Sequence, residues 1–226
     1  MSPNAAASVE GNLDSNLPFA VALYSFSSMR YQQVYGSAEF ASILGPRLIT
    51  AIAFRPDAVT GIAFTEALTN IQISLSTTQA QPDSLSTVFA NNVGADNTLL
   101  HSGPLVLSSA FTGPVGGPKD FDVTINFANP FLFDPSLGRL LLDVRSFAGG
   151  SIRPFDAFFV ANDSVSRVMT FIGQNATSTS GNVVDTLGLA TRFTFQAIPE
   201  PSAMLLAVLG AAIVFQQYRR KHVTAG

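Results

Sequence analysis

The sequence contains no cysteine, no tryptophan and only two histidines among 226 residues. The absence of cysteine excludes disulfides, thiol nucleophiles and cysteine-ligated metals. His101 and His222 cannot by themselves supply the three protein ligands of a catalytic zinc ion. A Ser-His-Asp triad would have to use His101, and no serine stands in a nucleophile-elbow sequence. We therefore interpret His101 as a surface or turn residue.

Charge is also scarce, because Asp, Glu, Lys and Arg make up only 12% of the chain. An average soluble protein has roughly 25%. Without the basic run 219–221, nine basic residues face fifteen acidic ones, which is a net charge of −6. An acidic chain without stripes of Lys and Arg argues against a nucleic-acid partner, since phosphate contacts supply most of that affinity. Uncharged polar side chains must cover most of the surface, as is common outside the cytoplasm.

Alternating apolar and polar residues, the pattern of strands with one buried face, recur through the chain. The clearest alternation lies in 70–78, 121–127 and 191–197, and β-branched or aromatic runs lie in 47–54, 139–145, 155–160 and 166–172. We expect these side chains to be buried: Val123, Ile125, Phe127, Leu140, Leu142, Val144, Phe193 and Phe195. The one short helix expected within the domain is 37–44, with Ser37 as its cap and Phe40, Ile43 and Leu44 facing inward.

Turn-forming residues separate these runs at 81–84, 90–97, 112–118 and 175–182. Many short strands with such punctuation are typical of an all-β, antiparallel β-sandwich or jelly roll. The sequence predicts one domain of this kind over 1–197.

The last thirty residues have a different character. Pro199, Glu200 and Pro201 predict an extended linker, because proline lacks a backbone donor and restricts the residue before it. An uncharged apolar stretch follows, and its residues are Ser202, Ala203, Met204, Leu205, Leu206, Ala207, Val208, Leu209, Gly210, Ala211, Ala212, Ile213, Val214 and Phe215. The segment 202–218 would be roughly 25 Å long as a helix, the lower limit for crossing a membrane.

A buried core helix is the alternative for this stretch. A separate transmembrane helix is favoured because the stretch is apolar all round and ends at Arg219, Arg220 and Lys221. Such a basic stop predicts that the C-terminus lies in the cytoplasm and the domain outside.

A Pro-Glu-Pro triplet, an apolar helix and a terminal basic cluster, in this order over 198–222, resemble the PEP-CTERM sorting signal. The resemblance implies an exosortase as partner, which would cleave near 199–201 and transfer the domain to the bacterial envelope. It implies transient anchoring in the inner membrane and association with exopolysaccharide. The domain also resembles an uncharacterised β-rich family attached to such tails, through 30–35, 52–57, 75–78, 89–96 and 141–145.

Proteins of this kind are expected to begin with a secretory signal, yet 1–17 has neither a basic region nor an apolar one. We interpret this as a start assigned too far downstream or a trimmed sequence. An atypical signal at 17–26 is the alternative.

Carboxylates are the acid and base groups that remain for catalysis. A glycosidase needs only two, and the candidates are Glu66, Asp120, Asp122, Asp143 and Asp156. Asp120 and Asp122 would share the solvated face of a strand, opposite Phe121 and Val123. Calcium is the most plausible ion, and its weak candidate ligands are Asn91, Asn92, Asp96 and Asn97, although plain turns use the same residue types.

Sugar-binding surfaces usually present flat aromatic rings beside polar groups. Tyr31 and Tyr35, with Arg30, Gln32 and Gln33, could form such a patch, although packing within the domain is the simpler interpretation. We expect an exported, non-enzymatic surface or matrix protein that needs no cofactor. A carbohydrate-active enzyme or sugar-binding module on the same fold is the alternative.

Overall fold

A computed structural model of the chain describes residues 1–20, 22, 28–147, 150–151 and 154–198. Apart from residues 197 and 198, these belong to one compact unit, Met1–Gln196. The described part is all-β: it contains strands and short 3₁₀ helices but no α-helix. The 3₁₀ helices are η1 (Asn4–Ala7), η3 (Ser37–Phe40) and η4 (Phe89–Asn92).

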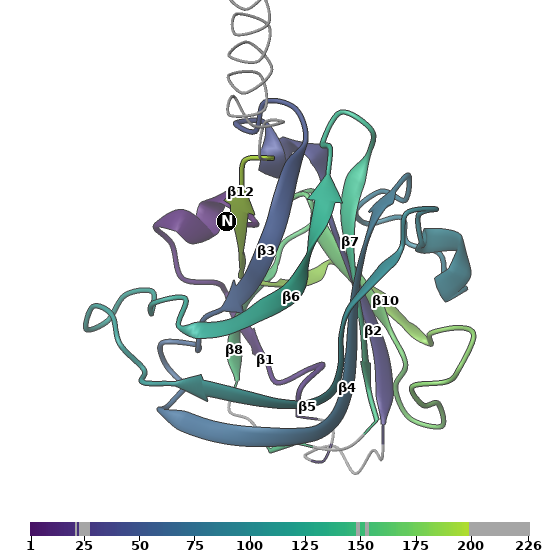
Figure 1. The fold of residues 1–226 in the computed structure, drawn as a ribbon. Helices are drawn as coiled ribbons and strands as arrows, with labels where there is room; N and C mark the ends of the chain where they lie inside the picture. The colour runs from purple at the N-terminus through teal and green to yellow at the C-terminus, as the bar shows by residue number, and fades with distance from the viewer. Residues whose placement is uncertain (21, 23–27, 148–149, 152–153, 199–226) are drawn as a thin grey trace, which may run out of the picture. The chain divides into compact units, whose positions relative to one another are not determined.

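The strands are antiparallel neighbours in three sheets (Figure 1). Their bounds are β1 (Leu13–Ser15), β2 (Met29–Tyr35), β3 (Arg47–Phe54), β4 (Phe64–Thr78), β5 (Thr98–Ser109), β6 (Val123–Phe133), β7 (Arg139–Ser146), β8 (Phe155–Phe159), β9 (Val165–Met169), β10 (Val183–Asp185), β11 (Leu187–Leu189) and β12 (Thr191–Gln196). The largest sheet has the order β10-β9-β2-β7-β4-β5, and the two three-stranded sheets have the orders β12-β3-β6 and β1-β8-β11.

The main core draws buried side chains from all three sheets, so the arrangement is sandwich-like. Ile71, Ile73 and Leu75 of β4 are fully buried, as the alternation in the sequence predicts. Aromatic rings fill much of the centre, and Phe19, Phe54 and Phe155 pack edge to face. The long strands β4 and β5 bend strongly (Figure 1), and their pairing is interrupted by two register shifts of the kind that β-bulges produce.

The buried positions expected from the alternation are largely confirmed. Seven of the eight side chains are buried, with exposed fractions of 9% or less, and Phe195 is half-buried against the core. The run 47–54 forms β3 with the expected bounds. The strands β1, β10 and β11 have only three residues each, too few to produce a recognisable alternation.

The short helix expected at 37–44 is present only as the 3₁₀ turn Ser37–Phe40. Its N-cap is Gly36 rather than Ser37, and no side chain caps it. Phe40 packs into the core as expected, but Leu44 is 80% exposed, which contradicts its inward placement. The 3₁₀ helix ends at Phe40, and residues 43 and 44 are not helical, so the helical spacing that would place Leu44 beside Phe40 is absent.

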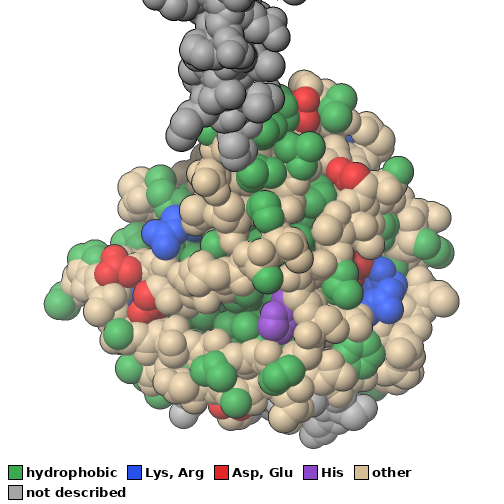
Figure 2. Space-filling model, in the orientation of Figure 1, with side chains coloured by type: hydrophobic (Ala, Val, Ile, Leu, Met, Phe, Trp, Pro, Cys, Tyr) green, Lys and Arg blue, Asp and Glu red, His purple; other side chains and the backbone are tan. Residues whose placement is uncertain are grey.

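The surface carries few charges. Figure 2 shows the face in view covered mainly by uncharged groups, with isolated charged side chains and hydrophobic side chains between them. This agrees with the low charged fraction of the sequence, 12%.

Candidate functional site

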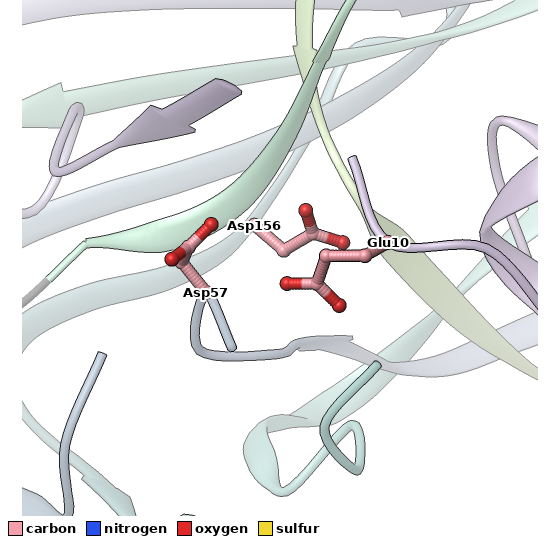
Figure 3. Close-up of side chains that lie close together, drawn as sticks. All are labelled: Glu10, Asp57 and Asp156. Carbon is pink, nitrogen blue, oxygen red and sulfur yellow. The ribbon is translucent and has the colours of Figure 1, made fainter. Parts of the chain in front are cut away.

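Three carboxylates from separate segments meet beside the buried end of β8 (Figure 3). Glu10 comes from the N-terminal segment, Asp57 follows β3, and Asp156 lies in β8. One oxygen of each lies within 4.8 Å of the other two. Carboxylates this close repel one another unless a cation or a proton lies among them.

The guanidinium group of Arg55, which is only 2% exposed, supplies a positive charge to this cluster. Its Nε donates to Oδ2 of Asp156 at 2.6 Å. Its two terminal nitrogens donate to the carbonyl oxygens of Ala6 and Val9 at 2.7 and 2.6 Å. Arg55 therefore fastens the N-terminal segment, including η1, to the outer face of the β12-β3-β6 sheet.

The remaining oxygens of the cluster are also largely used within the fold. Oε1 of Glu10 accepts from the backbone N–H of Ala58, and Oδ1 of Asp57 accepts from the N–H groups of Val59 and Thr60. Oε2 of Glu10 is buried and has no hydrogen-bond partner. Among the described residues, these three carboxylates are close enough together to bind a divalent cation. The guanidinium group of Arg55, however, already compensates the negative charge of Asp156.

Burial raises the pKa of Asp156 to about 6, against the opposing effect of the Arg55 charge. The negative charge of Glu10 raises this pKa further. Because Asp156 is fully buried and hydrogen-bonded to both Arg55 and the N–H of Gly11, it has no open approach for a substrate.

The other glycosidase candidates do not join this cluster. Asp143 is buried and forms a bidentate ion pair with Arg30. Asp122 accepts hydrogen bonds from the Ser109 hydroxyl and the Ala110 N–H, and Asp120 is exposed. Both precede β6, which begins at Val123, so the predicted strand placement of this pair is wrong. Glu66 in β4 is half-buried and accepts from the N–H of Ser151.

The suggested calcium ligands hold their own loop together. Asn92 is buried and donates to Oε1 of Gln32 and to the carbonyl of Ser86, while its Oδ1 accepts from the Ser86 N–H. Asp96 accepts from the N–H of Thr77 in β4, and Asn91 donates to the Ser86 hydroxyl. Asn97 lines a pocket on the large sheet.

The tyrosines proposed as a surface patch are packed inside the sandwich. Tyr31 and Tyr35 of β2 are fully buried. The Tyr31 hydroxyl donates to Oε1 of Gln33, which also accepts from the N–H of Leu189. The packing interpretation is the one that holds. His101 lies in β5 and is half-buried, with Nε2 unpartnered.

The sorting motif Pro199, Glu200 and Pro201, the apolar stretch 202–215 and the basic stop 219–221 lie outside the described residues. Among the residues that are described, no helix has the length and apolarity needed to span a membrane. The acidic cluster was not found from the sequence, because Glu10, Asp57 and Asp156 are separated by long stretches of chain. Its only local signal was a pair of charges, Arg55 and Asp57, at the end of a strand in a chain with little charge.

In comparisons with known proteins, no family model, no curated protein and no solved structure matches the chain.

Proposed function

We propose that this chain is an exported bacterial surface protein whose β-rich domain is sorted by an exosortase through the segment 198–222. The observation that carries the proposal is the ordered sequence of a Pro-Glu-Pro triplet, an uncharged apolar stretch and a basic cluster at the C-terminus. The last strand, β12, ends at Gln196, so the triplet follows the end of the folded domain almost directly.

We further propose that the domain has a structural or binding role in the exopolysaccharide matrix rather than a catalytic one. The two buried aspartates considered as glycosidase residues, Asp143 and Asp156, are each bonded to an arginine. A general acid or nucleophile must contact the substrate, and both carboxylates are instead engaged in ion pairs. This engagement favours the non-enzymatic proposal over a carbohydrate-active enzyme.

The test is to express the chain behind a signal peptide in a host that contains a matching exosortase. Membrane and soluble fractions are then separated, and the mature C-terminus is determined by mass spectrometry. We expect a product that ends near 199–201 and lacks 202–226. A variant with Pro199, Glu200 and Pro201 replaced by Ala should be exported but remain full length in the inner membrane.

The matched control replaces Pro114 and Pro118 by Ala in the loop between β5 and β6, which also removes two prolines. This control should be processed normally. A mature protein that still carries Arg219 to Gly226 in the same host would contradict the sorting proposal.

A further inference from the structure

The outer face of the large sheet carries a small polar grid formed by three adjacent strands. In the register of β2 with β7, Arg30 lies opposite Arg145 and Gln32 opposite Asp143. In the register of β7 with β4, Arg145 lies opposite Gln72 and Asp143 opposite Ser74. Directly paired residues of neighbouring strands share a face and lie about 5 Å apart.

The segment that contains η4 covers one end of this face. Phe89 packs there with Val34, Leu141 and Val168, and the Arg30 guanidinium lies 4.6 Å from the centre of the Phe89 ring. Beyond this cover the grid opens into a pocket of about 210 Å³. Its lining residues are Arg30, Gln72, Ser74, Asn97, Leu99, Asp143 and Arg145. A pocket of this size can hold several waters or a small polar ligand.

The charges in this pocket are not balanced. Asp143 is bound on both oxygens by Arg30, at 3.1 and 2.5 Å, and its Oδ2 also accepts from Nε2 of Gln32 at 2.8 Å. Arg145 is half-buried and forms no ion pair or side-chain hydrogen bond with any described residue. The pocket therefore contains two guanidinium groups, and its one carboxylate is bonded to Arg30.

Two like charges placed directly opposite each other on a sheet destabilise it. Asp96, which precedes the lining residue Asn97, is committed elsewhere, because its Oδ1 accepts from the Thr77 N–H at 2.7 Å. The guanidinium of Arg145 thus offers a planar set of donors with no acceptor from the described chain. Carboxylates match this planar set with two parallel hydrogen bonds.

We propose that this pocket is an oxyanion subsite, in which Arg145 binds the carboxylate of an acidic sugar. The assignment to a sugar rests on the proposed extracellular matrix function. It is supported by the neighbouring groups: Gln72, Ser74 and Asn97 present amides and a hydroxyl to sugar hydroxyls, and the exposed Leu99 offers an apolar contact to a sugar ring. None of these three polar side chains is engaged in a hydrogen bond with another described residue. The strands hold Arg30 and Arg145 in place, so the subsite exists before the ligand binds.

The test is calorimetric titration of the full chain, in a mild non-ionic detergent, with oligogalacturonate, glucuronate, acetate and glucose. The Nε–H resonance of Arg145, assigned by its loss in Arg145→Gln, provides a second readout. We expect saturable binding of the two acidic sugars, weaker binding of acetate and no binding of glucose. Arg145→Gln should weaken acidic-sugar binding by about tenfold or more, because it removes charge-assisted hydrogen bonds.

Arg139→Gln is the matched control. Arg139 lies on the same strand and the same face, six residues away, so its replacement changes net charge equally without touching the pocket. Arg145→Lys should retain part of the affinity, because it keeps the charge but loses the planar donors.

Equal losses in Arg139→Gln and Arg145→Gln would overturn the proposal, as would unchanged binding in Arg145→Gln or no saturable binding at all. Glucose or acetate binding as tightly as glucuronate would overturn the assignment to an acidic sugar. C-terminal processing does not depend on Arg145. The binding experiment can therefore fail while the sorting experiment succeeds, and the reverse.

Discussion

Replacing Arg55 by methionine should destabilise the domain strongly, because the guanidinium group is bonded on three sides within a buried site. The variant keeps a long apolar side chain but leaves Asp156 as a buried charge without its partner. It also leaves the Ala6 and Val9 carbonyls without their donors. Breaking a buried ion pair from one side costs about 3–5 kcal/mol, so we expect a loss of about 4 kcal/mol.

A loss of this size is a large fraction of the roughly 5–15 kcal/mol that stabilises a typical domain. The assay is urea unfolding of the full chain in a mild non-ionic detergent, followed by circular dichroism and tyrosine fluorescence, since the chain has no tryptophan. The N-terminal segment should also become sensitive to limited proteolysis near Ala6 to Val9, because Arg55 fastens it to the sheet.

Two comparisons make this experiment decisive. Arg192 is exposed and contacts the same Phe121 ring, so Arg192→Met should cost less than about 1 kcal/mol. The double variant Arg55→Met with Asp156→Asn should be less destabilised than the sum of the two single variants, because the second change removes the stranded charge. If Arg55→Met lowers the free energy of unfolding no more than Arg192→Met does, the buried hydrogen bonds of Arg55 do not stabilise the domain as we propose.

Two further predictions concern pH and backbone packing. Burial raises the pKa of Asp163 to about 6, so the folded state binds the proton of this carboxyl group more tightly than the unfolded chain does. The free energy of unfolding should therefore fall as pH rises from about 4 to 6 and become constant above that range. Asp163→Asn should reduce the dependence of the unfolding free energy on pH, measured by urea titrations at a series of pH values. An unchanged pH dependence would contradict the raised pKa of Asp163. Gly94→Ala would place a Cβ 1.8 Å from the Thr77 carbonyl oxygen, so it should cost about 1–3 kcal/mol in the same unfolding assay. Gly117→Ala, which meets only a proline side chain at 3.2 Å, should stay within about 0.5 kcal/mol, and equal losses in the two variants would refute the packing argument.

Much of the fold was predictable because burial of one strand face leaves a period of two in the sequence. The alternation in β4, β6 and β12 and the apolar run in β3 identified strands and core positions correctly. The short helix was predicted too long, since local apolar spacing alone does not show where a turn departs from the core. Leu44, which was expected to face the core, is 80% exposed.

The candidate sites were less predictable, because they join residues from distant parts of the chain. Arg55 is separated from Asp156 by 101 positions, and Arg30 from Asp143 by 113. Asp143 and Asp156 looked like catalytic candidates from residue type alone. Only their arginine partners, brought close by strand pairing, indicate a structural role.

The sequence by itself determined the strand-rich character of the domain, its low surface charge and the three-part pattern of its C-terminal segment, because these depend on local composition and spacing. The tertiary structure alone decided which charges are paired. Strand register placed Arg145 opposite Arg30 while Asp143 was already bonded, and no sequence rule specifies the register between strands so far apart. The positive charge left at Arg145 is therefore a property of the folded sheet.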